Sequence, residues 1–98
     1  MITRIVRMEF APEKGEDFLA LFNAIKQRIR HFPGVQVFEL HRDAHQTNGF
    51  YTYSIWRNAD DLEAYRKSDV FRSIWPDTKK MFTAQPQAFS LKKEMVVD

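Results

Sequence analysis

Apolar and polar residues alternate along four stretches of the chain, and a period of two is typical of β-strands. The four stretches are residues 2–10, 35–42, 50–57 and 87–96. In the first, Val6 and Met8 lie on one side and Ile5 lies on the other. In the last, Phe89 and Leu91 share one face. The pattern therefore predicts four strands, each with two distinct faces.

The segments between these strands place apolar residues at spacings of three and four, as amphipathic helices do. The first helix is expected over residues 17–30, and Gly34 permits the turn that follows it. Asn58 and Ser68 are expected to cap two further helical stretches, because their side chains can accept a free backbone N–H at a helix start. Pro76 is expected to kink or restart the last of these.

The second and third strands are joined by residues 43–49, which are rich in turn formers and predict a hairpin. In the second strand, Val35 and Val37 are expected on the side opposite Phe38 and Leu40. Both faces of this strand are therefore apolar.

The third strand is also apolar on both faces, with Phe50 and Trp56 on one side. Tyr51, Tyr53 and Ile55 occupy the other side. The helices can cover only one face of an antiparallel sheet, and a face exposed to water should be polar. We therefore expect a second copy of the chain to cover the other face, which makes the protein a homodimer.

The order of elements, β-α-β-β-α-β, predicts an α+β fold of the ferredoxin-like class with a four-stranded antiparallel sheet. The chain has 98 residues, of which 44% are hydrophobic and 29% charged, so residues 1–98 are expected to form one globular domain. The alternating N-terminal residues differ from a signal peptide, and no apolar run suits a membrane span. A cytoplasmic protein without a membrane partner is the default expectation.

Charge and cysteine content exclude several functions. The net charge is +2, with acidic and basic residues interspersed, so no nucleic-acid partner is expected. An RNA recognition motif would also need a small residue where Tyr51 stands. The absence of cysteine excludes disulfides, thiolate metal sites and cysteine nucleophiles. His41, Asp43 and His45 have a metal-like spacing, but no distant fourth ligand is evident, so no metal site is predicted.

Three segments resemble the antibiotic biosynthesis monooxygenase family: residues 31–35 (HFPGV), 50–56 (FYTYSIW) and 61–71 (DLEAYRKSDVF). The resemblance spans nearly the whole chain. It implies a dimeric α/β barrel, in which two ferredoxin-like subunits pack sheet to sheet and each holds a small-molecule pocket between its sheet and its helices. Members include cofactor-independent oxygenases of anthrones and quinols, and haem-degrading enzymes.

The resemblance also assigns roles to positions. Trp56 matches the tryptophan that lines the pocket of the anthrone oxygenases, and Thr52 replaces the asparagine that works with it. A threonine hydroxyl can still donate one hydrogen bond to a substrate oxygen. In the haem-degrading branch, an asparagine lies near Met8, a tryptophan at Tyr65 and the iron-binding histidine at Trp75. Because these three residues are absent here, neither haem nor another cofactor is expected.

Strand parity and the helical covering together suggest a pocket site. The candidate catalytic residues are Trp56, Thr52 and His41, whose imidazole could accept a proton at the pocket mouth because it titrates near neutrality. The indole N–H of Trp56 is expected to converge on a ligand with the neighbouring hydroxyls. The candidate substrate-binding residues are Ser54, Tyr65, Phe71 and Trp75. The alternative is that the aromatic residues among them are plain core.

These observations predict a cofactor-independent monooxygenase that acts on a small aromatic, quinol or anthrone-like compound in a pocket between sheet and helices. The alternative is a non-catalytic protein that binds a small hydrophobic molecule. Arg4 and Arg7 lie on opposite faces of the first strand, so only one of them can point into such a pocket.

Overall fold

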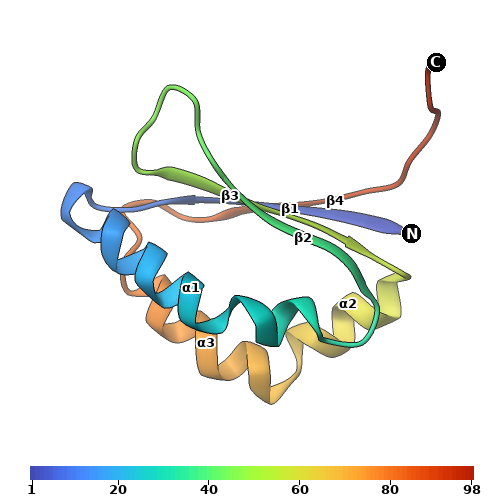
Figure 1. Ribbon diagram of the computed structural model, residues 1–98, viewed down its shortest axis with the longest axis horizontal. Coiled ribbons are helices and arrows are strands. Elements are labelled where there is room, and N and C mark those ends of the chain that lie inside the picture. Colours follow the sequence, from blue (N-terminus) through green and yellow to red (C-terminus); the bar gives the residue numbers. More distant parts are fainter.

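The computed structural model describes all 98 residues and shows one antiparallel sheet with helices packed on a single side (Figure 1). The elements are β1 (Ile2–Glu9), a 3-10 turn η1 (Pro12–Lys14), α1 (Gly15–Arg30), β2 (Val35–Arg42), β3 (Gly49–Trp56), α2 (Ala59–Arg66), α3 (Asp69–Lys79) and β4 (Gln87–Leu91). The strand order is β2-β3-β1-β4, with all neighbours antiparallel. The predicted α+β, ferredoxin-like fold is therefore confirmed.

Both predicted helix caps are present. The Asn58 side chain accepts a hydrogen bond from the Asp61 N–H at 2.8 Å, and the Ser68 hydroxyl accepts one from the Phe71 N–H at 3.2 Å. Each pairs a backbone donor that the first turn of a helix leaves free. These two caps explain why α2 and α3 are separate helices with only a short junction between them.

Pro76 was expected to kink or restart the last helix, and it causes no restart, because α3 runs as one helix from Asp69 to Lys79 with Pro76 inside it. A proline inside a helix leaves one carbonyl unpaired four residues earlier, here that of Arg72. Arg72 is exposed, so water can take the place of the missing N–H donor.

The last strand is also shorter than predicted, because β4 ends at Leu91 and not at residue 96. Leu91 is paired with Thr3, and β1 itself begins at Ile2, so β1 offers almost no further backbone for pairing. Residues 92–98 are exposed and extend away from the helices (Figure 1).

A turn with one left-handed residue connects α1 to β2. Gly34 has a φ of +95°, and its carbonyl accepts a hydrogen bond from the Arg57 N–H at 2.8 Å. A Cβ atom at Gly34 would collide with the side chain of Asp61. Glycine is therefore required here both for its backbone conformation and for its lack of a side chain.

A β-bulge changes the faces of β2. The register with β3 shifts between Val35 and Val37, so that Val35 is paired with Trp56 and buried while Val37 is paired with Ile55. The expectation that both valines share a side opposite Phe38 is therefore wrong. An extra residue in one strand reverses the alternation beyond it.

The core consists of two separate clusters instead of one continuous core, and only 13 of the 98 residues are buried. The first contains Met8, Phe10, Phe18 and Phe50. The second contains Val35, Trp56 and Leu62. The space between the two clusters is where a binding site can form.

No helix covers the other face of the sheet, which we call the open face. One of the two central strands, β3, presents Tyr51, Tyr53 and Ile55 there. The edge strand β4 contributes Phe89 and Leu91, which are 49% and 48% exposed. The β2–β3 loop and the C-terminal segment both project on this side of the sheet (Figure 1). No helix combines the length and apolar character needed to cross a membrane.

Candidate functional site

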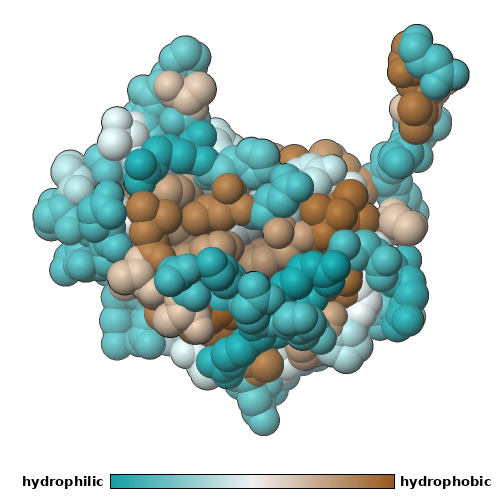
Figure 2. Space-filling view, viewed as in Figure 1, coloured by the Kyte–Doolittle hydropathy of each residue, from teal (hydrophilic) through white to brown (hydrophobic).

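A cavity of about 360 Å³ lies between the sheet and the helices, and residues of both core clusters line it. Figure 2 shows apolar residues gathered in the band between these two layers, with hydrophilic residues around them. Of the 21 lining residues, 15 are hydrophobic, so the cavity suits a largely apolar ligand. Six of the predicted site residues line it, namely Thr52, Ser54, Trp56, Tyr65, Phe71 and Trp75.

Strand alternation places the residues that form the sheet side of the cavity. Thr52, Ser54 and Trp56 follow one another at a spacing of two on β3, so all three point toward the helices. On β1, Val6 is directly opposite Thr52 and also lines the cavity. The sequence pattern is sufficient to predict this side of the site.

Trp56 contributes an aromatic surface and not a hydrogen-bond donor. It is 1% exposed, and its indole N–H donates to the Ser54 hydroxyl at 3.0 Å. The Ser54 hydroxyl in turn donates to the Arg4 carbonyl at 3.4 Å. The expected convergence of the indole N–H and both hydroxyls on a ligand is therefore wrong, because the N–H and the Ser54 hydroxyl are already paired with protein groups.

Aromatic rings form a continuous wall on the helical side. Tyr65 lies with its ring centroid 5.2 Å from that of Trp56 and 5.3 Å from that of Phe71, and Phe71 stacks on Trp75 at 5.6 Å. Offset and edge-on contacts of this kind stabilise aromatic clusters and also accept flat ligands. Trp56 belongs to the second core cluster and Tyr65 packs against it, as the plain-core interpretation expects, and the same rings also border the cavity.

Two hydroxyls remain free to contact a ligand. Burial raises the pKa of Tyr65 to about 12, so its phenol stays protonated and acts as a donor at neutral pH. The Thr52 hydroxyl makes no hydrogen bond to the protein. Every fully buried side-chain polar atom does have a partner, so the Thr52 oxygen is not fully buried. Because Thr52 lines the cavity, its oxygen is accessible from there.

Two arginines at the cavity were not predicted as site residues. Arg4 on β1 and Arg66 at the end of α2 both line it, whereas Arg7 lies on the open face. Burial, followed by the positive charge of Arg66, lowers the pKa of Arg4, while Glu63 acts in the opposite direction. The even spacing of Arg4 with Val6 and Met8 was the available signal for Arg4. Arg66 reaches the site only through packing between segments far apart in sequence.

His41 does not line the cavity. Its Nε2 is 2.8 Å from a carboxylate oxygen of Glu39. Its ring lies in a T-shaped arrangement with Tyr53 on the open face, with the two ring centroids 6.2 Å apart. Leu40 packs against the first core cluster, so the next residue of the strand must point the other way. A role as proton acceptor at the pocket mouth does not fit this position.

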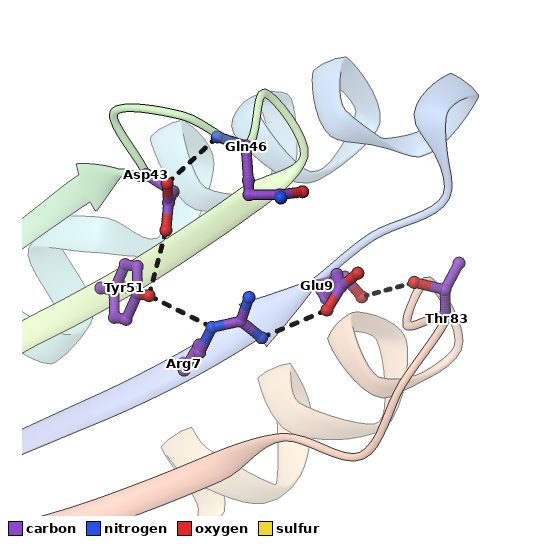
Figure 3. A network of polar contacts seen from close by, with 6 residues as sticks. All are labelled: Arg7, Glu9, Asp43, Gln46, Tyr51 and Thr83. Atoms are coloured by element: carbon purple, nitrogen blue, oxygen red, sulfur yellow. Dashed lines mark hydrogen bonds and ion pairs between the residues drawn. The ribbon is translucent and has the colours of Figure 1, made fainter.

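Asp43 closes the β2–β3 loop instead of serving a metal. Its carboxylate accepts a hydrogen bond from the backbone N–H of His45 at 2.8 Å. It also accepts hydrogen bonds from the backbone N–H of Gln46 at 3.0 Å and from the Tyr51 hydroxyl at 3.1 Å (Figure 3). These bonds, that from His45 first, lower the pKa of Asp43. No group of three or more His, Cys, Asp or Glu residues in the structure could hold a metal ion.

Comparison with known proteins identifies the relatives of this chain. The family model described as antibiotic biosynthesis monooxygenase matches residues 1–75. The chain belongs to the antibiotic biosynthesis monooxygenase family. No curated protein sequence matches it.

Solved structures show the same fold at low sequence identity. A crystal structure of an antibiotic biosynthesis monooxygenase has a TM-score of 0.88 and 16% identity, with 95% of this chain and 98% of that one covered. Rv0793 from Mycobacterium tuberculosis has a TM-score of 0.88 and 16% identity, with 99% and 98% covered. A conserved protein from Methanosarcina mazei Go1 has a TM-score of 0.89 and 17% identity, with 96% and 94% covered. At these identities the likeness establishes the fold.

In this member of the antibiotic biosynthesis monooxygenase family, the cavity is better equipped to stabilise negative charge than to accept a proton. Its lining residues include two arginines and the hydroxyls of Thr52 and Tyr65, but no carboxylate and no imidazole. Positive charge and hydroxyl donors of this kind favour an oxygen atom that carries negative charge.

Proposed function

We propose that this chain is a cofactor-independent monooxygenase that oxidises a small aromatic, quinol or anthrone-like compound. The observation that carries the proposal is the cavity, whose aromatic wall and free hydroxyls of Thr52 and Tyr65 suit a flat molecule with an oxygen substituent. Its volume of about 360 Å³ falls within the ordinary range of ligand pockets. Membership of the antibiotic biosynthesis monooxygenase family supports the same reaction class.

The reaction balances without an outside reductant. With an anthrone-like substrate, an activated CH₂ group loses a proton, and the resulting carbanion gives electrons to O₂ and forms a C–O bond. The peroxide then loses water to leave C=O. One oxygen atom enters the product and the other leaves as water, and all four electrons come from the substrate. Thr52 and Tyr65 donate hydrogen bonds to the substrate carbonyl oxygen, which carries the charge of the deprotonated form.

The substrate itself must be acidic, because no carboxylate or imidazole among the lining residues can take its proton. Water or hydroxide then accepts the proton, and the protein lowers the barrier by stabilising the anion. This mechanism predicts a rate that rises with pH until the bound substrate is fully ionised.

The test is oxygen consumption by metal-stripped protein supplied with anthrone, whose CH₂ group can follow this route. We expect turnover that Thr52→Val reduces about tenfold or more, since it removes the hydroxyl and preserves the side-chain shape. Thr83→Val, at an exposed threonine outside the cavity, is the matched control and should leave the rate unchanged. The proposal would be refuted if no oxygen were consumed. It would also be refuted if wild type, Thr52→Val and Trp56→Phe reacted at equal rates.

A second candidate is a binding protein for a hydrophobic molecule, which the lack of a proton acceptor in the cavity favours. Such a protein would gain thermal stability from an aromatic ligand without forming any product. Product analysis of the same incubations separates the two functions.

We further propose that a second copy of the chain covers the open face, giving a homodimeric α/β barrel. Tyr53 pairs with Ile5 near the centre of this face, and Phe89 beside them is 49% exposed. An apolar face of this kind is unfavourable in water and is typical of a subunit contact. The dimer has a structural role, because the cavity lies on the opposite side of the sheet.

A further inference from the structure

The two charged residues that line the cavity are both arginines, Arg4 and Arg66. The remaining polar lining residues are neutral, and no acidic residue lines the cavity. Arg66 is exposed and paired with Glu63, whereas Arg4 is half-buried, and burying charge is costly unless the charge is paired. The presence of Arg4 therefore calls for a physical explanation.

Arg4 lacks the partner that an arginine in this position would need. Its Nη1 donates to the hydroxyl of Ser90, a neutral group, at 2.9 Å. The nearby carboxylate of Glu63 is instead paired with Arg66 at 3.4 Å and Lys67 at 3.6 Å. A guanidinium has five N–H donors arranged to match two oxygens of one anion, and most of those on Arg4 remain available.

Arg7 provides a direct contrast on the same strand. Its side chain is paired with the Glu9 carboxylate at 3.2 Å and with the Tyr51 hydroxyl at 3.1 Å, on the open face (Figure 3). These contacts raise the pKa of Arg7, whereas burial and the charge of Arg66 lower that of Arg4. The chain therefore neutralises the arginine outside the cavity and leaves the one inside without an anion.

We propose that the ligand of the cavity is an anion: an aromatic body that carries a carboxylate or an ionised phenol or enol, with its charged oxygen held by Arg4. Arg66 also lines the cavity, but it is exposed and already paired with Glu63, so Arg4 is the residue with donors to spare. The aromatic body lies against Tyr65 and Phe71, which line the same cavity. This inference rests on the proposed function for the role of the cavity, and it adds the charge of the substrate.

Binding of matched naphthalene probes tests the inference without any reaction. At neutral pH, 2-naphthoate is an anion and 2-naphthalenemethanol is a neutral molecule of similar size. We expect the full-length protein to bind naphthoate about tenfold or more tightly than the alcohol in calorimetry. Arg4→Gln should abolish this difference, and Arg7→Gln, on the same strand but on the open face, should preserve it.

A third probe, 2-naphthol, identifies the source of the charge. If an ionised phenol is accepted, naphthol binding should tighten as pH rises through the ionisation of the free probe, in wild type but not in Arg4→Gln. If the affinity for naphthol does not change with pH while naphthoate binds tightly, the ligand carries a carboxylate.

Equal affinity for naphthoate and the alcohol, or a preference for naphthoate that survives Arg4→Gln, would overturn the inference. These outcomes are independent of oxygen consumption. If naphthoate binding depends on Arg4 but no aromatic compound consumes oxygen, the inference stands and the proposed monooxygenase activity fails.

Discussion

The indole N–H of Trp56 donates to the hydroxyl of Ser54 at 3.0 Å, two residues earlier on the same strand. Both residues are almost fully buried, with Trp56 1% and Ser54 5% exposed. Ser54→Ala should therefore lower the free energy of unfolding by about 1–3 kcal/mol, the cost of leaving a buried donor unpaired. Urea unfolding of the variant and wild type measures the difference.

The control for this prediction is Ser73→Ala on α3. Ser73 is exposed, so its substitution should change the free energy of unfolding by less than about 0.5 kcal/mol. If Ser54→Ala is as mild as Ser73→Ala, the hydrogen bond does not fix the indole and Trp56 is free to offer its N–H to a ligand.

Gly34→Ala should be strongly destabilising. The backbone conformation with φ of +95° disfavours any side chain, and the new methyl group would also collide with Asp61. We expect a loss of at least about 1–3 kcal/mol in the free energy of unfolding. Gly15→Ala, at the first residue of α1, has no positive φ and should cost less. Equal effects at the two glycines would contradict this account of the turn.

Tyr65 should make stability depend on pH in the alkaline range. Its pKa is raised to about 12 by burial, above the ordinary value near 10. The unfolded chain loses this proton first, so the contribution is fully present below pH 10 and is lost as pH rises toward 12. Between these values the free energy of unfolding should fall by about 1.4 kcal/mol per pH unit from this group.

Unfolding of wild type and Tyr65→Phe at pH 9, 10 and 11 measures the contribution of Tyr65, since phenylalanine has no proton to lose. The difference between the two proteins should change with pH above 10. A constant difference over this range would show that the phenol is not buried as described.

The open face should hold two chains together. Tyr53→Glu introduces a charge near its centre, opposite Ile5, and should convert a two-chain species into a folded single chain in sedimentation velocity. Gln27→Glu, on an exposed position of α1, makes the same change of charge elsewhere and should leave the mass unchanged. A single-chain mass for the wild type at micromolar concentration would contradict the dimer.

The sequence was sufficient for the features that depend on local periodicity. Alternation predicted which side of β3 carries Thr52 and which carries Tyr53, and the polar residues Asn58 and Ser68 predicted two helix starts. These features need only the geometry of one strand or one helical turn.

The features that escaped prediction depend on neighbours distant in sequence. The bulge before Val37 requires knowledge of the β3 register, and the end of β4 at Leu91 is determined by where β1 begins. The pairing of Trp56 with Ser54 depends on the side-chain conformations. Arg4 and Arg66 meet at one cavity only after β1 and α2 have packed on the same side of the sheet.

The central claim is that the cavity supports oxygenation driven by the substrate alone. Metal-stripped protein supplied with anthrone under ¹⁸O-labelled oxygen tests it directly, with mass spectrometry of the product. One labelled oxygen atom per product molecule, formed by wild type and strongly reduced in Thr52→Val, is the predicted result. Product without label, or labelled product formed at the same rate without the protein, would contradict the account.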